Sequence, residues 1–223
     1  MATTKTQRIG IWIIALFMAI GTVGSFAIIA LANENQQTDQ KRVNELNAQY
    51  QKDTQEYQAK VAAQAAELSG QYYETFKPYE SRPVTFDADA VKELKTEDIV
   101  VGDGETLTSE STFTAYYIGW TPDANMFDSS FTEGEAVLKA PIEAAPGGVI
   151  KGWTDGVAGM KVGGIRELTI PSELGYGATG SGESIKPNTP LKFIIMVIPT
   201  PEKIAEPVVP QELINYYQTG RLR

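Results

Sequence analysis

Aromatic and glycine-rich motifs follow one another in the second half of this 223-residue chain, and these are the residues best suited to do chemistry. In chain order they are Tyr117, Phe127-Asp128-Ser129-Ser130, Val149-Ile150-Lys151-Gly152-Trp153, Tyr176-Gly177-Ala178-Thr179-Gly180 and Phe193. The chain has no histidine and no cysteine, on which most nucleophilic, proton-shuttling and soft-metal chemistry depends. We therefore expect an aromatic-lined pocket whose reaction needs no metal, no cofactor and no nucleophile.

The net charge of the chain limits the kinds of partner that it is expected to bind. Lys and Arg total 19 against 28 Asp and Glu, which gives a net charge of -9. An acidic chain has no broad electrostatic attraction for phosphate backbones, so nucleic acid is not an expected partner. The absence of cysteine excludes disulfides but does not identify the compartment.

The N-terminal segment indicates the location. Residues 9–33 carry no charge, and a helix of that length can cross a hydrocarbon core of about 30 Å. Lys5 and Arg8 precede the segment and Glu34 follows it, so the positive-inside rule predicts a single-pass cell-membrane protein with residues 34–223 outside the cytoplasm. The alternative is a signal peptide cleaved after Ala32, which would give a secreted protein. The length of the apolar stretch favours an uncleaved anchor.

Residues 34–70 have the composition of a helical stalk. They lack proline, and glycine appears only at the end, at Gly70, where we expect the helix to stop. Apolar residues recur along one helical face at Val43, Leu46, Tyr50, Tyr57, Val61, Ala65, Leu68 and Tyr72. A single long helix is the favoured interpretation, and a dimer formed through this stalk as a coiled coil is the alternative.

The rest of the chain predicts a linker over 71–90, a folded domain over 91–200 and a tail over 201–223. Within the domain we expect strands over 112–120, 136–142, 166–170 and 191–198 and one helix over 150–160. This pattern is typical of the α+β class, with an antiparallel sheet wrapped on one short helix. In the tail, Pro210 and Gly220 bound a short predicted helix.

The strand predicted over 191–198 is apolar on both faces, so both faces should be covered. We expect the short helix of the tail to cover the second face of this strand, through Leu213, Ile214, Tyr216 or Tyr217.

The stretch from about residue 97 to 199 resembles an FKBP-type peptidyl-prolyl cis-trans isomerase domain, a little under half of the chain. The motifs that carry the resemblance occur in order and near the family's spacing. They are Gly102-Asp103-Gly104, Tyr116-Tyr117-Ile118-Gly119, Phe127-Asp128-Ser129-Ser130, Val149-Ile150-Lys151-Gly152-Trp153, Gly156-Val157, Met160, Val162-Gly163, Leu168-Thr169-Ile170-Pro171, Tyr176-Gly177-Ala178-Thr179-Gly180 and Leu191-Lys192-Phe193.

The resemblance implies a role for each matching residue. Trp153 would form the pocket floor, the Ile150 N–H would bond a ligand carbonyl, and the Tyr176 hydroxyl would bond a second carbonyl. Asp128 would lie beside the twisting amide and act electrostatically. The substrate-binding residues would be Tyr117, Phe127, Leu138, Val149, Ile185 and Phe193. Taken singly, Tyr117 and Phe193 would be core residues, and only the joint order favours a pocket.

The chain also departs from the family pattern. Leu138 and Ala140 stand where aromatic residues are common, and Ser181 and Ser184 replace a histidine and an aliphatic residue. The common basic residue after the Phe-Asp-Ser-Ser motif is missing, and Phe131 stands in that region. These changes thin one flank of the pocket, which bears on catalytic rate and on binding of a macrolide inhibitor.

We therefore expect a membrane-anchored isomerase, or rotamase, that assists the folding of proline-containing polypeptides outside the cytoplasm. Rotation about an X-Pro bond breaks no covalent bond, so desolvation in an aromatic pocket suits it. The alternative is a non-catalytic FKBP-fold module that binds client proteins as a chaperone at the cell surface.

Overall fold

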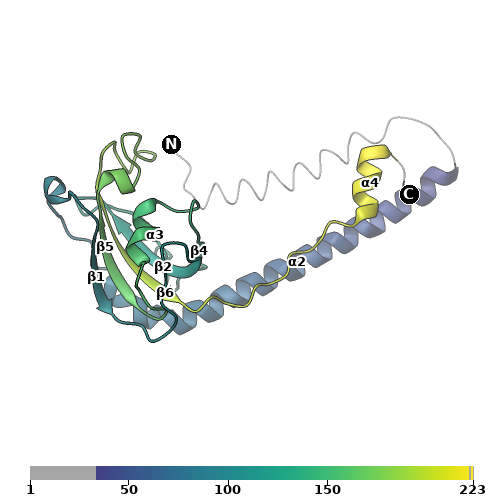
Figure 1. Cartoon of the computed structure of the whole chain (residues 1–223). Coiled ribbons are helices and arrows are strands. Elements are labelled where there is room, and N and C mark those ends of the chain that lie inside the picture. The colour runs from purple at the N-terminus through teal and green to yellow at the C-terminus, as the bar shows by residue number, and fades with distance from the viewer. Residues whose placement is uncertain (1–33, 221, 223) are drawn as a thin grey trace. The chain divides into compact units, whose positions relative to one another are not determined.

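The computed structural model describes residues 34–220 and Leu222 of the chain (Figure 1). It divides into two compact units, Gln58–Ile204 and a second unit that combines Met1–Tyr57 with Ala205–Arg223. The long helix α2 (Glu34–Phe76) contributes its second half to the first of these units and its first half to the other.

The unit Gln58–Ile204 is built on one antiparallel sheet. Its strand order is β1-β5-β6-β2-β3, with β4 paired to β2 beside β3. The strands are β1 (Lys95–Val100), β2 (Phe113–Trp120), β3 (Met126–Ser129), β4 (Ile142–Ala144), β5 (Ile165–Ile170) and β6 (Leu191–Ile198). The short helix α3 (Lys151–Val157) and three 3-10 turns, η1 (Lys77–Tyr79), η2 (Ala88–Ala90) and η3 (Ser172–Leu174), complete the unit. The predicted α+β architecture is confirmed.

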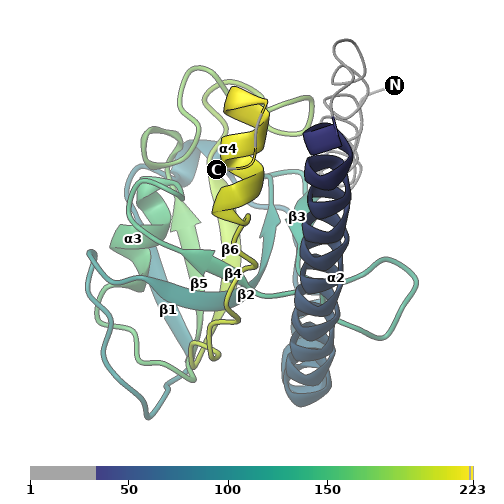
Figure 2. The ribbon, with the colours of Figure 1, turned by 90° about the vertical axis from the view of Figure 1, so that its right-hand side faces the viewer.

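The central strand β6 explains how the sheet is covered. All of its residues except Lys192 are buried, because the apolar side chains that alternate along it enter two different hydrophobic clusters. Phe193, Ile195 and Val197 belong to a first cluster with Trp153 and Val157 of α3. The second cluster, on the opposite face, consists of Phe76, Tyr116, Ile118, Trp120, Phe131, Leu138, Ile165, Ile194, Met196 and Ile198. α3 and the end of α2 therefore lie on opposite sides of the sheet (Figure 2).

The predicted cover of the second face is wrong. We expected the tail helix there, but the residues packed on Ile194, Met196 and Ile198 include Phe76 of α2, with Leu68 and Tyr72 partly buried beside them. No residue of the tail belongs to the second cluster among the residues that the structure describes. Leu68, Tyr72 and Phe76 recur at intervals of four, so one face of α2 supplies a large part of the cover.

Gly70 does not end α2, contrary to expectation. The helix continues to Phe76 and is followed by the 3-10 turn η1, whose second residue is Pro78. A glycine inside a helix is less favourable than alanine by about 1 kcal/mol, and packing of Tyr72 and Phe76 on the sheet outweighs that amount. The first part of the predicted linker over 71–90 is therefore helical.

The strand predictions succeed where side-chain patterns are strong. β2, β5 and β6 confirm the strands expected over 112–120, 166–170 and 191–198. The strand expected over 136–142 is wrong, since only an isolated bridge between Phe131 and Leu138 and the short β4 occur there. β1 and β3 were not predicted, because neither shows a regular hydrophobic alternation: β1 is mostly exposed, and β3 has only four residues, three of them partly buried.

The other unit contains the helix α4 (Gln211–Thr219), which confirms the predicted C-terminal helix. Pro210 precedes it, and Gly220 closes it in the left-handed conformation with φ 73°. Arg42 of α2 donates from Nε and Nη2 to the two carboxylate oxygens of Glu212, each at 3.1 Å. Leu213 is 1% exposed, so α4 buries one apolar residue beside these polar contacts.

The membrane span predicted over 9–33 lies outside the described residues. Within residues 34–220, no helix is both long enough and apolar enough to cross a bilayer.

Candidate active site

Four aromatic rings meet where β2, β3, β6 and α3 come together on the first face of the sheet. The Tyr117 ring lies edge-on to Trp153 with centroids 5.1 Å apart, and Phe193 lies edge-on to Trp153 at 5.3 Å. Phe127 meets Phe193 in the same geometry at 5.5 Å. Edge-to-face pairs at these distances are the favoured arrangement for aromatic rings. The structure thus brings together four of the predicted pocket residues.

Gly119 explains how two of these rings approach the sheet so closely. It pairs with Phe193 of β6 on one side and with Asp128 of β3 on the other. A Cβ atom at Gly119 would lie 2.5 Å from the Phe193 ring and 2.7 Å from the Phe127 ring. Only glycine leaves room for both rings, which gives a physical reason for the last residue of the Tyr-Tyr-Ile-Gly motif.

Buried and exposed rings have different parts in this group. Trp153 is 4% exposed and Phe193 is 3% exposed, so they form its floor. Tyr117, Phe127 and Tyr176 are only partly buried and lie at its edge. Val149 and Ile150 are partly buried against the same cluster. The result is an apolar surface with solvent at its rim.

A charged hydrogen bond lies at this rim. The Tyr117 hydroxyl donates to Oδ2 of Asp128 at 2.6 Å. Burial, followed by this hydrogen bond and the charge of Asp128, raises the pKa of Tyr117 far above its usual value, and Tyr176 contributes a smaller part. Tyr117 therefore stays a hydrogen-bond donor at physiological pH and orients the Asp128 carboxylate.

α3 begins at the edge of the same group. Ile150 is its N-cap residue, with an extended backbone (φ -62°, ψ 148°), and its carbonyl accepts from the Trp153 N–H at 2.9 Å. Among the described residues, no acceptor is found for the Ile150 N–H itself. This backbone donor is consistent with the role that the family resemblance implies for it.

The loop after η3 carries Tyr176 and is held by its own backbone. Gly177 N–H bonds the Ser172 carbonyl at 2.8 Å, and Asn188 N–H bonds the Gly177 carbonyl at 2.8 Å. Ser181 and Ile185 form an isolated antiparallel bridge, and Ile185 is buried in the first cluster. The Tyr176 side chain therefore stands on an ordered loop that Ile185 ties to the cluster.

Known proteins similar to this chain share one family. Residues 104–198 match the family profile of FKBP-type peptidyl-prolyl cis-trans isomerases. An FK506-binding protein of Neisseria meningitidis serogroup A is 41% identical over 105 residues, which cover 47% of this chain and 94% of the relative. The chain belongs to this family. It is a peptidyl-prolyl cis-trans isomerase by that membership, and the Escherichia coli isomerase FkpA is 32% identical over 183 residues, covering 80% of this chain and 64% of FkpA.

One predicted substrate-binding residue of the FKBP domain is not at this site. Leu138 is 4% exposed and lies in the second cluster, where it forms a bridge with Phe131. It follows the turn at residues 133–136 and lies on the face that α2 covers. The prediction that Leu138 lines the pocket is therefore wrong. Ala140, which also stands where aromatic residues are common in the family, is exposed.

Arg166 is a residue of the FKBP domain that the sequence reasoning missed. It is 6% exposed, bonds both carboxylate oxygens of Asp98 at 2.6 and 3.0 Å, and donates to the carbonyls of Gly156 and Ala158 at 2.8 and 3.0 Å. These carbonyls are at the end of α3, so a positive charge fixes the helix that carries Trp153. The signal in the sequence is the pair of adjacent charged residues, Arg166 and Glu167, inside a predicted strand.

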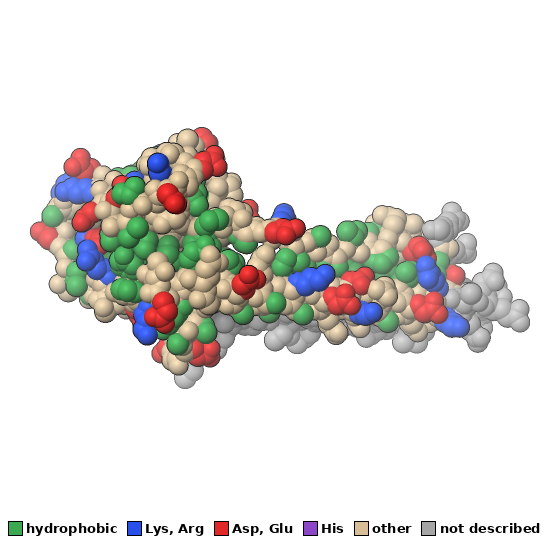
Figure 3. Space-filling view, turned by 90° about the horizontal axis from the view of Figure 1, so that it is seen from below, with side chains coloured by type: hydrophobic (Ala, Val, Ile, Leu, Met, Phe, Trp, Pro, Cys, Tyr) green, Lys and Arg blue, Asp and Glu red, His purple; other side chains and the backbone are tan. Residues whose placement is uncertain are grey.

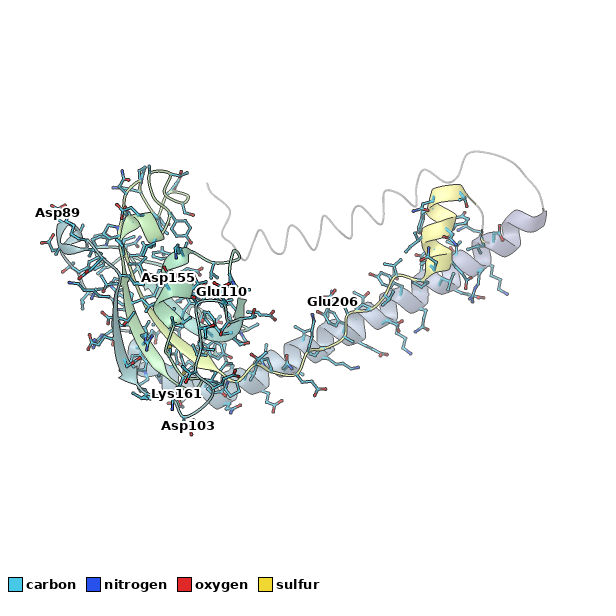
Figure 4. The ribbon with its side chains drawn as sticks, viewed as in Figure 1. Asp89, Asp103, Glu110, Asp155, Lys161 and Glu206 are labelled. Atoms are coloured by element: carbon cyan, nitrogen blue, oxygen red, sulfur yellow. The ribbon has the colours of Figure 1, made fainter. Side chains whose placement is uncertain are left out.

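The acidic side chains of the FKBP domain are dispersed. Asp89, Asp103, Glu110 and Asp155 stand at separate positions around it (Figure 4). Within the part of the chain that the structure describes, no group of three or more acidic side chains is placed to hold a metal ion. On the face shown in Figure 3, basic and acidic side chains are interspersed.

A separate surface hollow of about 540 Å³ lies at the junction of α2 and η1. Its lining consists of Glu74, Lys77, Pro78, Glu80 and Ser81. These are polar or charged residues apart from the proline, and none belongs to the predicted site. An apolar peptide segment fits the aromatic group better than this hollow.

Proposed function

We propose that the chain assists protein folding outside the cytoplasm by isomerising X-Pro bonds at the aromatic group around Trp153. The observation that carries this proposal is the contrast between a buried aromatic floor and a partly exposed rim that holds the Tyr117–Asp128 hydrogen bond. Such a surface removes water from a proline ring while leaving an oriented carboxylate beside it.

The reaction requires only a lower rotational barrier. The barrier to peptide rotation is about 18–20 kcal/mol, whereas the isomers of an X-Pro bond differ by about 0.5–1 kcal/mol. Rotation removes amide resonance and with it the charge separation of the planar amide. An apolar pocket therefore disfavours the planar ground state more than the twisted transition state, which lowers the barrier.

We assign the following roles. Trp153 and Phe193 support the proline ring, and Tyr117, Phe127, Val149, Ile150 and Ile185 surround it. The Ile150 N–H and the Tyr176 hydroxyl bind substrate carbonyls on either side. Asp128, held by Tyr117, favours the twisted amide electrostatically.

The test is a protease-coupled assay of a proline peptide with the full chain and three substitutions. We expect Asp128→Ala to lower kcat/KM about a hundredfold and Tyr176→Phe about tenfold, as for other polar groups that act on a transition state. Asp103→Ala is the matched control, because Asp103 is an exposed carboxylate on a loop of the same domain. Unchanged catalysis in Asp128→Ala would remove Asp128 from the mechanism. Peptide binding without any isomerisation by the wild type would favour the client-binding module instead.

We further propose that residues 9–33 anchor the chain and that the FKBP domain lies outside the cytoplasm. The support is the uncharged segment and the cationic residues before it. Protease added to intact cells should remove the domain, and the intact mass of the native chain should include residues 1–33. A domain protected from protease would contradict the orientation, and a mass that begins after Ala32 would indicate secretion.

Two partner predictions accompany this function. The Neisseria relatives are named FK506-binding proteins, and we propose that a macrolide occupies the same aromatic group in this chain. Competition of FK506 with a proline peptide would test it. Dimerisation through α2 stays a prediction, which sedimentation of the full chain checks.

A further inference from the structure

The segment that follows Asp128 is attached to the end of α2. β3 ends at Ser129, and the chain then runs through Phe131 and Leu138 before it reaches β4. The Leu138 N–H donates to Oγ of Ser69 at 2.7 Å, and this hydrogen bond is buried. The Phe131 ring stacks on Phe76 with centroids 5.4 Å apart and an interplanar angle of 5°. α2 thus contacts this segment by a buried hydrogen bond and by aromatic packing on Phe131.

The same segment is connected to the catalytic rim by short steps. The Lys139 N–H bonds the Ser130 carbonyl at 2.8 Å, and the Ser130 N–H bonds the Tyr117 carbonyl at 2.8 Å. The Tyr117 N–H in turn donates to Oγ of Ser130 at 2.9 Å, and the Tyr117 hydroxyl reaches Asp128. Ser130 is 3% exposed. A displacement of Phe131 or Leu138 therefore acts on both Tyr117 and Asp128.

β3 is short and lies at the edge of the sheet. It is four residues long, lies at one end of the sheet order, and pairs with β2 with a register shift between Gly119 and Trp120. A short edge strand with an irregular register is weakly specified by its own pairing. Contacts beyond its end therefore contribute to the position of Asp128, together with its pairing to Gly119 and its hydrogen bond from Tyr117.

We propose that Ser69 and Phe76 of α2 are positioning residues for Asp128, an inference that rests on the proposed catalytic function. Ser69 fixes the loop through the Leu138 N–H, and Phe76 fixes it through the Phe131 ring. The end of the stalk is thus part of the isomerase machinery and more than a spacer. A shift of about 1 Å in a catalytic group can lower a rate by about a hundredfold, so even a small loss of position is measurable.

The residue directly after the Phe-Asp-Ser-Ser motif, Phe131, faces α2. It is 6% exposed in the second cluster, with Tyr73 edge-on to it at 6.2 Å. Phe131 thus contacts two aromatic residues of α2.

The experiment uses four single variants of the full chain. Ser69→Ala removes the buried acceptor, and Ser69→Thr retains a hydroxyl and serves as rescue. Phe76→Leu removes the stacking with Phe131 while it retains an apolar side chain. Thr54→Ala is the matched control for Ser69→Ala, because the Thr54 hydroxyl donates to the Tyr50 carbonyl within α2 itself.

We expect Ser69→Ala and Phe76→Leu to lower kcat by about tenfold with little change in KM, since the aromatic surface that binds the peptide is retained. Ser69→Thr and Thr54→Ala should retain wild-type kcat. Each measurement is made well below the unfolding temperature of the variant, so that only folded protein is compared.

The decisive measurement is a double-mutant cycle with Asp128→Ala. If α2 acts through Asp128, Ser69→Ala and Phe76→Leu should lower kcat less than twofold in the Asp128→Ala background. An equal loss in both backgrounds, or no loss from either variant alone, would overturn the proposal while the catalytic role of Asp128 stands. If Asp128→Ala alone has wild-type activity, the catalytic proposal for Asp128 fails, and the positioning proposal falls with it.

Discussion

The two faces of the FKBP sheet both carry aromatic side chains, but these differ in packing geometry and in exposure. On the first face, Tyr117, Phe127, Trp153 and Phe193 meet edge-to-face, and two of the four rings remain partly exposed. On the second face, the rings of Phe76 and Phe131 stack in parallel and are almost fully buried.

The difference comes from what covers each face. The short helix α3 covers part of the first face and leaves Tyr117 and Phe127 at a rim. The last turns of α2 close the second face with Leu68, Tyr72 and Phe76. Aromatic residues on a strand therefore form an accessible site or a closed core, depending on how much of that face a helix covers.

The largest expected effect on stability is that of Phe76→Ala, on the closed face. Phe76 is fully buried, and truncation of a buried phenylalanine lowers the free energy of unfolding by about 3–5 kcal/mol. Phe127→Ala, on the open face, should destabilise the domain less and lower kcat/KM more. Urea unfolding, followed by tryptophan fluorescence, measures the first quantity and the peptide assay the second. Equal destabilisation by the two variants would mean that the two faces do not differ in this way.

Two adjacent tyrosines of β2 sharpen the comparison further. The Tyr116 hydroxyl is buried without a hydrogen-bond partner among the described residues, and burial raises the pKa of Tyr116 to about 12. Tyr116→Phe removes a buried unpaired group, so we expect the free energy of unfolding to rise by about 1 kcal/mol with activity unchanged.

Tyr117→Phe is its counterpart on the open face. It removes the donor that orients Asp128, so we expect kcat/KM to fall about tenfold. Thermal unfolding and the peptide assay are run on both variants. A loss of activity in Tyr116→Phe would show that the closed face contributes to catalysis by another route.

The sequence predicted the first face better than the second. Glycine-rich motifs and the aromatic order identified Tyr117, Phe127, Trp153, Tyr176 and Phe193, because these motifs require special backbone or close packing. The sequence could not show that Leu138 and Phe131 face away from the pocket, since the turn between β3 and β4 has no regular period. The buried role of Ser69 was also hidden, because a serine in a polar helix gives no sign of its partner.

Gly70 shows why local propensity misplaced the end of α2. A Cβ atom there would have no neighbour within 4 Å, so the glycine serves no close approach in this unit. Gly70→Ala should therefore stabilise the helix that covers the second face by up to about 1 kcal/mol without changing kcat/KM. Urea unfolding of the variant checks this value, and Gly119→Ala, which meets two rings, is the contrasting control. A destabilised Gly70→Ala would indicate that the helix must bend at this point.

The smallest expected effect on stability concerns the contact of α4 with the first half of α2. This contact depends on exposed polar groups, unlike the apolar packing of the second face. The hydrogen bond and charge of Arg42 lower the pKa of Glu212. A depressed carboxyl pKa adds stability that is complete above the unfolded value of about 4.3 and is lost as the pH falls through the lower folded value. We expect amide exchange in α4 to accelerate over that acidic range, and Arg42→Gln to remove most of the pH dependence. Glu206→Gln is the control, as an exposed carboxylate of the same tail. An unchanged pH dependence in Arg42→Gln would mean that apolar contacts such as that of Leu213, and not the ion pair, hold α4 in place.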